Sequence, residues 1–258
     1  MTDSMRGFGI DIGGSGIKGS VVDLEEGRFA GERLRIPTPQ PSTPKAVAEV
    51  CAQIVKEQGW EGPVGCTFPA VVVHGTVRTA ANVDESWIGS NLEVIVGERL
   101  RERVIGVNDA DAAGLAEARF GAAKGRGGVV LVATLGTGIG TALIHDGVLV
   151  PNTELGHLEL YGRDAETRAS DAARDRDNLS WEQWAKRLQK YFTHVEGLFW
   201  PDLIVVGGGV SKKYAKFLPH LKLRTEIVPA SLLNDAGIIG AALLAVEAKS
   251  PSTHALSP

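Results

Sequence analysis

The first residues able to do chemistry are Asp11-Ile12-Gly13-Gly14-Ser15-Gly16-Ile17-Lys18, in which a carboxylate, a glycine turn and a lysine follow one another. Such turns point backbone N–H groups into a concavity that suits phosphate oxygens. A carboxylate at a strand end, Asp11, can also hold Mg²⁺ through water, because that ion keeps most of its own water ligands. The alternative is a plain hairpin with a solvated lysine, and this segment alone does not separate the two.

A second glycine turn has the sequence Thr134-Leu135-Gly136-Thr137-Gly138-Ile139-Gly140-Thr141, in which glycine alternates with hydroxyl or apolar residues. GxGxG spacing alone is weak evidence, and a dinucleotide-binding interpretation fails because no helix follows it. Beside the first turn it becomes informative. Two such turns in one chain predict a site for a phosphate chain.

A third group, Asn108-Asp109-Ala110-Asp111, lies between an expected strand and an expected helix. Asn and Asp are preferred helix N-caps, and taken alone this is the stronger interpretation. Beside two phosphate turns, Asp109 becomes a candidate general base, since a kinase needs a carboxylate to orient the accepting hydroxyl and take its proton. Asp111 is the rival candidate, but it falls within the first helical turn.

The fourth group, Glu154-Leu155-Gly156-His157-Leu158-Glu159, combines carboxylates with an imidazole. A metal site needs further ligands, and no cluster of cysteine or histidine lies nearby in the sequence. Recognition of vicinal sugar hydroxyls is the better interpretation, because a carboxylate accepts several O–H donors.

The fifth group is Gly207-Gly208-Gly209. It is either a plain strand-to-helix turn or a turn that lets a nucleotide or polyphosphate lie against the backbone.

The elements that must position these groups alternate between strand and helix, which predicts an α/β protein. Residues 37–44 contain four prolines and predict a loop, and the charged segment 163–178 predicts an exposed loop or helix. Strand–glycine turn–strand occurs twice, which is the nearest thing to an internal repeat. We expect strands at 8–12, 17–22, 63–69, 71–73, 104–107, 129–135, 141–144 and 203–206, and helices at 45–58, 91–103, 110–120, 181–199, after 209 and at 236–246.

Length and composition limit the classes of function. The 258 residues suffice for one large domain or two small ones that share a cleft. The net charge of −4 implies no general affinity for nucleic acid. Cys51 and Cys66 are the only cysteines, which gives neither a disulfide framework nor a zinc site and fits a reducing cytosol. No signal-peptide pattern and no apolar run of ~18 residues occurs, so we expect a cytoplasmic protein without a membrane partner.

Taken together, these groups resemble the ROK family of sugar kinases, in order along nearly the whole chain. The resemblance implies the actin-like ATPase fold, similar to hexokinase and ribonuclease H, with two α/β domains around a cleft. We place the smaller domain at 1–108, joined by the C-terminal helix at about 236–248, and the larger one at 109–235.

The resemblance also implies roles for individual residues. Asp109 is implied to be the catalytic base, and Asn108 to contact the sugar. ELGH at 154–157 matches the family's sugar-binding ExGH, which makes Glu154 and His157 hydroxyl ligands. The segment 79–83, with Trp87, resembles the sugar loop and makes Asn82 a further candidate. The implied donor-binding residues are Asp11 (also Mg²⁺, through water), Gly13, Gly14, Ser15, Gly16, Lys18, Thr134, Gly136, Thr137, Gly138, Gly208 and Gly209.

The chain departs from the family at one point. Many members carry a CxCGxxGC zinc motif after ExGH, followed by a sugar-binding glutamate. The zinc cysteines are absent here, so we expect no structural zinc. Residues 165–170 match the later part of that pattern, which makes Glu166 the third sugar carboxylate but leaves it without the anchoring zinc loop.

Within the family, the chain is most similar to actinobacterial members that phosphorylate glucose from polyphosphate, often alongside ATP, as homodimers. A basic track that holds the polymer would draw on Lys18, Lys124, Arg126, Lys212 and Lys213, although a lysine pair at the start of a helix is usually solvated surface. The stretches that carry this resemblance are 7–19, 78–89, 108–117, 151–160 and 200–211.

The resulting hypothesis is a phosphotransferase with an alcohol acceptor, which moves a phosphoryl group from polyphosphate or ATP to the 6-hydroxyl of glucose, with Mg²⁺. An ATP-dependent glucokinase or mannokinase of the same family is the nearest alternative. A polyphosphate hydrolase would leave Glu154, His157 and Glu166 without purpose. A sugar-responsive DNA-binding regulator would need an N-terminal helix-turn-helix, for which the sequence before Phe8 leaves no room.

Overall fold

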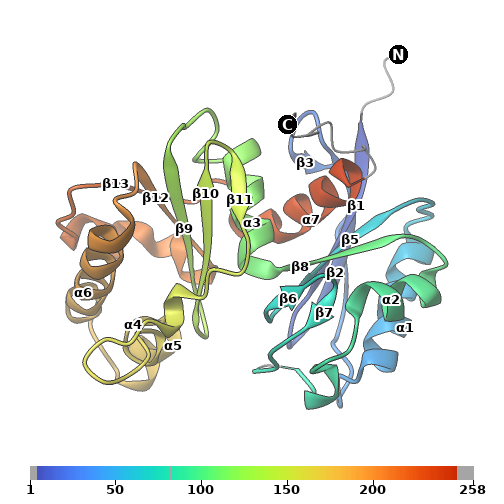
Figure 1. Cartoon of the computed structure of the whole chain (residues 1–258), viewed down its shortest axis with the longest axis horizontal. Coiled ribbons are helices and arrows are strands. Elements are labelled where there is room, and N and C mark those ends of the chain that lie inside the picture. Colours follow the sequence, from blue (N-terminus) through green and yellow to red (C-terminus); the bar gives the residue numbers. More distant parts are fainter. Residues whose placement is uncertain (1–4, 82, 249–258) are drawn as a thin grey trace, which may run out of the picture. The chain divides into compact units, whose positions relative to one another are not determined.

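The computed structural model describes residues 5–81 and 83–248. The chain divides into two compact units: unit 1 holds Met1–Ala112 and Gly237–Pro258, and unit 2 holds Ala113–Ala236. The helix α3 (Asp109–Arg119) contains the boundary between them. Each unit is built on its own sheet (Figure 1). None of the helices in the described residues combines the length and the apolarity needed to cross a membrane.

Unit 1 is built on a six-stranded sheet with the order β3-β2-β1-β5-β8, to which β4 adds beside β2. The hairpin of β1 and β2 is antiparallel, and β5 and β8 continue the sheet in parallel from β1. The neighbouring strands β1 and β5 are almost wholly buried, as expected for parallel strands covered on both faces. The strand bounds are β1 Arg6–Ile12, β2 Ile17–Asp23, β3 Arg28–Phe29, β4 Leu34–Ile36, β5 Val64–Phe68 and β8 Val104–Asn108.

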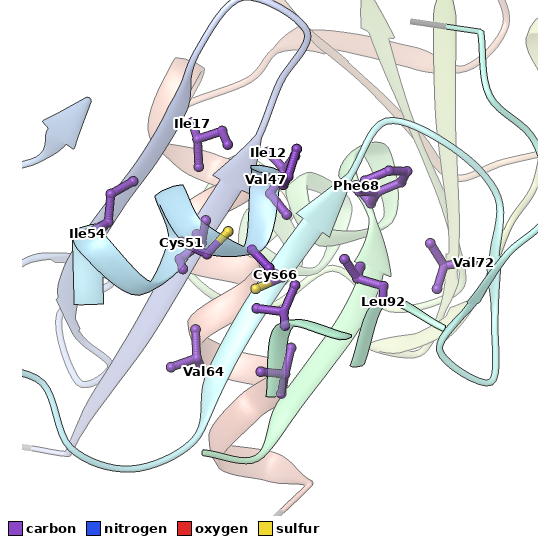
Figure 2. Close-up of a cluster of buried hydrophobic side chains, with 14 of the residues drawn as sticks. Ile12, Ile17, Val47, Cys51, Ile54, Val64, Cys66, Phe68, Val72 and Leu92 are labelled. Carbon is purple, nitrogen blue, oxygen red and sulfur yellow. The ribbon is translucent and has the colours of Figure 1, made fainter. Parts of the chain in front are cut away.

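Three helices of unit 1 pack around this sheet: α1 (Pro44–Glu57), α2 (Leu92–Leu100) and α7 (Ala236–Glu247). The helix α1 starts where Thr43 accepts a hydrogen bond from the Ala46 N–H, and it buries an apolar face. Figure 2 shows that face, with Val47, Cys51 and Ile54 against the strands. The helix α7 approaches β5 so closely that a Cβ on Gly65 would lie 1.8 Å from the carbonyl oxygen of Ala241. Only glycine permits that contact.

A small two-stranded sheet completes unit 1, formed by β6 (Val72–Val73) and β7 (Thr76–Val77). The 3₁₀ helix η1 (Glu85–Trp87) follows it and buries Trp87, whose indole N–H donates to the carbonyl oxygen of Ser42 at 2.9 Å. This contact fixes the segment before the α2 helix to the loop before α1.

Unit 2 repeats the topology of unit 1 with the order β11-β10-β9-β12-β13. Here, too, a hairpin extended by an antiparallel strand is followed by two parallel strands. Its core joins this sheet to the amphipathic helix α6 (Trp181–Phe199) and the 3₁₀ helix η4 (Leu218–His220). The strand bounds are β9 Val129–Leu135, β10 Ile139–His145, β11 Val148–Val150, β12 Leu203–Gly207 and β13 Glu226–Pro229.

Two predicted helices differ from those observed by more than one residue at an end or in type, and the strand predicted at 141–144 is longer, since β10 starts at Ile139. The helix expected at 91–103 ends at Leu100, because Arg101 adopts a left-handed conformation (φ 60°) and its N–H bonds to the Gly97 carbonyl. The helix expected after the glycines at 207–209 is a 3₁₀ helix, η3 (Gly209–Lys216), interrupted at Lys213. The short strands β3, β4, β7, β11 and β13 were not predicted, since two to four residues carry little periodic signal.

Candidate functional site

The first glycine turn joins β1 to β2 in unit 1 and is closed by a hydrogen bond from Gly13 N–H to the Gly16 carbonyl at 3.2 Å. Asp11 and Lys18 are partners across the two strands, and Lys18 Nζ lies 2.9 Å from Asp11 Oδ2. The other carboxylate oxygen, Oδ1, accepts a hydrogen bond from the Thr67 hydroxyl at 2.8 Å. The lysine is therefore engaged with its own hairpin and does not extend freely into solvent.

The tip of this turn is exposed at Gly14 and Ser15. The Ser15 carbonyl accepts a hydrogen bond from Arg35 Nη2 at 3.0 Å. The sequence analysis missed Arg35, which lies in β4, because nothing in its neighbourhood marks it as part of the turn. Its guanidinium adds a second positive charge to the turn that the first motif forms.

A divalent cation can be tested against Asp11. Across the described residues, no three carboxylate, imidazole or thiol groups converge as protein ligands of a metal ion would. Mg²⁺ does not need such a set, because it commonly uses one or two carboxylates, water and substrate phosphates. The Asp11 side chain is 22% exposed and lies beside Lys18, and a carboxylate in this position fits a role as one water-mediated anchor.

Asn108 and Asp109 stand where β8 ends and α3 begins. The Asn108 Oδ1 accepts hydrogen bonds from the N–H groups of Ala110 (2.8 Å) and Asp111 (3.2 Å), and its Nδ2 donates to the Ala70 carbonyl at 3.1 Å. Asn108 is thus a buried helix cap. Asp109 is exposed, with Oδ1 accepting from the Ala110 N–H at 2.9 Å, whereas Asp111 is buried. Of the two aspartates, Asp109 is the one accessible to a ligand.

The second glycine turn joins β9 to β10 in unit 2. Gly136 N–H donates to the Gly138 carbonyl at 3.0 Å, and the Gly136 carbonyl accepts from Ala172 N–H at 3.1 Å. Thr137 is exposed at the tip, and Thr134 is half-buried. Ala172 lies in the helix α5 (Asp171–Arg176), which thereby holds this turn from outside the hairpin.

Glu166, the first residue of the helix α4 (Glu166–Ala169), connects this turn to the candidate sugar ligands. Its Oε2 accepts the N–H of Ile139 at 3.0 Å. A Cβ on Gly138 would lie 2.4 Å from the same oxygen, so a larger residue there would displace the Glu166 carboxylate. The donor turn and one candidate sugar carboxylate are therefore in direct contact within unit 2.

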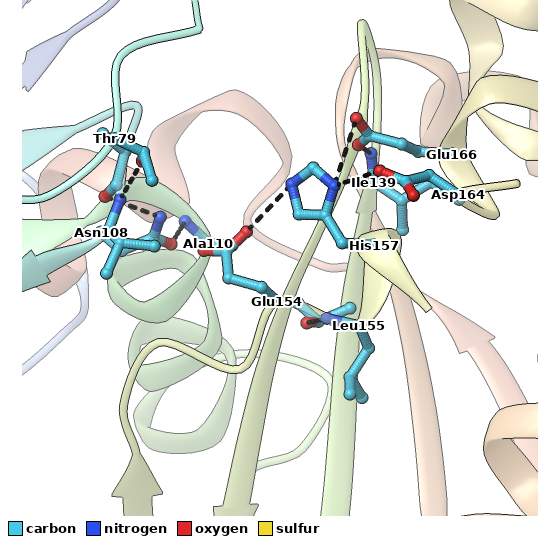
Figure 3. A network of polar contacts seen from close by, with 12 residues as sticks. Thr79, Asn108, Ala110, Ile139, Glu154, Leu155, His157, Asp164 and Glu166 are labelled. Atoms are coloured by element: carbon cyan, nitrogen blue, oxygen red, sulfur yellow. Dashed lines mark hydrogen bonds and ion pairs between the residues drawn. The ribbon is translucent and has the colours of Figure 1, made fainter. Parts of the chain in front are cut away.

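His157 is the centre of the candidate sugar ligands, which Figure 3 shows with Glu154 on one side of the ring and Asp164 and Glu166 on the other. Nε2 lies 3.8 Å from Glu154 Oε2, whereas Nδ1 lies 2.9 Å from Asp164 Oδ2 and 4.0 Å from Glu166 Oε1. The structure therefore brings together Glu154, His157 and Glu166. It adds Asp164, which the sequence analysis missed among the many charges of 163–178.

The cluster changes the acidity of its own members. The pKa of Glu154 is raised from its ordinary value, chiefly because partial burial disfavours the charged carboxylate. The pKa of His157 is also raised, chiefly by the hydrogen bond to Asp164, with further contributions from Glu166 and Glu154. Glu154 is thus easier to protonate than an ordinary glutamate, and His157 is easier to charge than an ordinary histidine.

The third glycine turn and the basic residues after it lie in unit 2. Gly208 adopts a left-handed φ of 82° between β12 and η3, and the exposed Gly209 begins η3. In η3, Lys213 Nζ and Lys216 Nζ lie 5.8 and 5.6 Å from the centre of the Trp181 ring. Of the residues considered for a basic track, Arg126 pairs with Glu226, and Lys18 pairs with Asp11. Asn82 lies outside the described residues.

Comparison with known proteins agrees with this architecture. Residues 7–174 match the model of the ROK family. The chain is 52% identical over 246 residues to the polyphosphate glucokinase of Mycobacterium tuberculosis, which covers 95% of this chain and 93% of the relative.

Solved structures are also similar. The inorganic polyphosphate/ATP-glucomannokinase of Arthrobacter sp. strain KM is 56% identical with a TM-score of 0.90, over 94% of this chain and 99% of that one. A ROK family glucokinase from Streptomyces griseus, solved with glucose and AMPPNP, is 26% identical with a TM-score of 0.81, over 94% and 100%. This chain therefore belongs to the ROK family and has the two-domain actin-like ATPase fold of its sugar kinases.

Proposed function

We propose that this protein is a polyphosphate-dependent glucokinase, which transfers a terminal phosphoryl group from inorganic polyphosphate, and also from ATP, to the 6-hydroxyl of glucose. The observation that carries the proposal is the contact between Glu166 and the second glycine turn. A polyhydroxyl ligand and a phosphate chain need neighbouring sites in a kinase, and a polyphosphate hydrolase has no use for the carboxylates around His157. The 52% identity to a polyphosphate glucokinase over 95% of the chain supports the same activity.

In unit 2, the proposed sugar ligands are Glu154, His157 and Glu166, which the structure groups together. In unit 1, Asn108 and Asp109 are proposed from the family resemblance alone to contact the sugar. Carboxylates accept hydrogen bonds from vicinal hydroxyls, and the imidazole supplies a further polar contact. Asp109 is the proposed general base: its side chain is exposed, and in phosphoryl transfer such a carboxylate orients the hydroxyl and accepts its proton. Asn108 supports it by capping the helix on which Asp109 stands.

The donor is assigned to the two glycine turns, with backbone N–H groups as the main contacts. The resemblance to kinases implies a divalent cation, and Mg²⁺ held through water by Asp11 is the proposed one. When bound, such a cation neutralises charge on the transferring phosphoryl group. The turn at Gly208 and Gly209 and the lysines of η3 are proposed to contact the rest of a polyphosphate chain.

We also propose an oligomeric state, a cellular compartment and domain bounds for this protein. A cytoplasmic homodimer is proposed from the family resemblance, and the two free, buried cysteines, Cys51 and Cys66, are compatible with a reducing compartment. Light scattering on the purified chain would measure its mass. The proposed domains are 1–108 with the last helix and 109–235. Limited proteolysis would test them, since stable fragments that end near these bounds are expected.

The direct test supplies glucose and Mg²⁺ with either purified polyphosphate or ATP and measures glucose 6-phosphate, with phosphate release without glucose as the control. Product from polyphosphate supports the proposal. Product from ATP alone keeps the kinase and removes the polymer. The Arthrobacter relative is described as a glucomannokinase, so mannose belongs in the same assay as a second acceptor. Phosphate release without any sugar phosphate would contradict a kinase.

A further inference from the structure

Asp164 contacts the imidazole of His157 more closely than any sugar-ligand candidate does, with Oδ2 2.9 Å from Nδ1. We propose that Asp164 is a positioning residue that fixes the tautomer and the orientation of His157, so that Nε2 is presented to a sugar hydroxyl beside Glu154. This inference rests on the proposed sugar kinase activity for its consequence, but the contact itself can be tested without that activity.

The chemistry of the two groups determines which nitrogen carries the proton. An ionised carboxylate can only accept hydrogen bonds, so at 2.9 Å the Nδ1 atom must be the donor. In the neutral imidazole, Nε2 is then left as an acceptor for a hydroxyl proton. The nearest carboxylate oxygen to Nε2 belongs to Glu154, at 3.8 Å, which leaves room for both groups to contact one ligand.

The loop that carries Asp164 is held by backbone hydrogen bonds. Leu160 N–H donates to the Arg163 carbonyl at 2.8 Å, and Ala165 N–H donates to the Leu158 carbonyl at 2.9 Å. The Asp164 carbonyl accepts from the N–H of Thr167 at 3.1 Å and from its hydroxyl at 2.7 Å. The segment therefore fixes Asp164 at the start of α4, two residues before Glu166.

The contact between His157 and Asp164 connects two segments that a zinc motif would otherwise hold together. The family pattern implies an anchored loop between the ExGH segment and the sugar-binding glutamate, and this chain lacks the cysteines that would anchor it. Here the hydrogen bond from His157 to Asp164 connects the two ends of that loop directly. One carboxylate thus orients the histidine and holds the segment that carries Glu166.

Asp164 is 49% exposed and His157 is 55% exposed, so their pairing adds little to the stability of the fold. Its effect is expected on ligand binding and on the titration of the ring. The charged groups that face His157 from its surroundings are Glu154, Asp164 and Glu166, and all three favour the charged imidazole.

The first experiment observes the imidazole itself by two-dimensional ¹H–¹⁵N NMR of the full chain, with His157→Gln to assign the signal among the six histidines. In the wild type, we expect the Nδ1–H tautomer above the pKa of His157. Asp164→Asn keeps an acceptor oxygen and should keep that tautomer, but should lower the pKa of His157, because the neighbouring negative charge is removed. Asp164→Ala should release the ring to the Nε2–H tautomer.

The second experiment measures KM and kcat for glucose in the same variants. Asp164→Ala should raise the KM for glucose by roughly 5- to 30-fold, with a smaller change in kcat and an unchanged thermal midpoint. Asp164→Asn should recover most of that loss. The matched control is Asp175→Asn, which removes the same charge from an aspartate of unit 2 that is 68% exposed and should behave like the wild type.

An Nε2–H tautomer in the wild type would overturn the proposal, as would an unchanged KM and titration in Asp164→Ala. If the wild type does not phosphorylate any sugar, the proposed function fails, whereas the NMR result still decides whether Asp164 fixes the ring.

Discussion

The two glycine turns begin from the same local topology but are held in different ways. In unit 1, Asp11 and Lys18 face each other across the hairpin just before the turn, so the first turn carries its own charges. In unit 2, the corresponding position pairs Thr134 with Gly140, and no acidic residue, lysine or arginine lies between Val129 and His145. A carboxylate reaches the second turn only from outside, through Glu166.

Under the proposed function, this difference implies that the two turns contribute differently to binding of the donor and the sugar. The first turn can serve a phosphate chain and a cation with groups of its own. The second turn supplies neutral backbone groups and shares Glu166 with the cluster around His157, so that the proposed donor and sugar contacts are coupled there. A change in the second turn should therefore affect both substrates, whereas a change in the first should affect the donor alone.

The largest expected effect lies outside both turns, at Asp109. Asp109→Asn removes the base but keeps the shape of the side chain, so the protein should fold normally and lose roughly 10²–10⁴ in kcat. Because the base acts on the hydroxyl, the loss should be equal with polyphosphate and ATP, with little change in the KM for either donor. Turnover near that of the wild type would contradict the assignment of the base.

The second prediction compares the turns directly. A Cβ on Gly138 would lie 2.4 Å from Glu166 Oε2 and displace it, so Gly138→Ala should lower kcat/KM for glucose on the order of 10-fold. Gly13→Ala is the matched control, since its Cβ would lie 3.1 Å from the Gly16 carbonyl, and it should change the donor KM alone. Equal effects on glucose would show that the turns do not divide the work.

A third, smaller effect concerns the polymer. Lys213→Gln together with Lys216→Gln removes two charges beside Trp181 and should raise the KM for long polyphosphate a few-fold, more at low salt than at high salt. ATP is short, so its KM should stay unchanged. Lys186→Gln with Lys190→Gln, two lysines of α6, is the control for loss of net charge. A parallel rise for ATP would remove these lysines from the polymer site.

The smallest effect is a pH dependence. The pKa of Glu154 is raised by burial, so this carboxylate is protonated at a higher pH than an ordinary glutamate and loses acceptor capacity there. As the pH falls through that raised value, the KM for glucose should rise. The profile of kcat/KM for glucose in the wild type and in Glu154→Gln measures this. If both profiles are the same on the acid side, another group is responsible.

Much of the fold follows from local patterns. The helix α6 was predicted at its observed bounds, since its apolar face repeats at helical spacing. The structure shows that Ser180 and Gln183 also form a capping box at its start. The helix α2 was predicted too long, because no local signal shows that Arg101 adopts a left-handed conformation. The strand β13 was missed, since its four residues become a strand only by pairing with β12.

Some residues of the candidate site could likewise be predicted from the local sequence, and others could not. Each glycine turn, the segment around Asp109 and the ELGH segment is a short continuous stretch of sequence, so residue types and spacing are enough to identify it. The grouping of Glu154, His157 and Glu166 followed only from the family resemblance. Asp164 and Arg35 could not be found, because each acts through a contact with a residue that lies elsewhere in the chain.

The sequence by itself determined the longer strands and helices and the glycine turns, because periodicity and backbone freedom are properties of neighbouring residues. Only the tertiary structure decided that Lys18 is engaged by Asp11, that Asn108 is a cap, that Asp109 is exposed while Asp111 is buried, and that Asp164 contacts His157. Hydrogen bonding, charge pairing and burial depend on which side chains meet in space, and spacing along the chain does not specify those contacts.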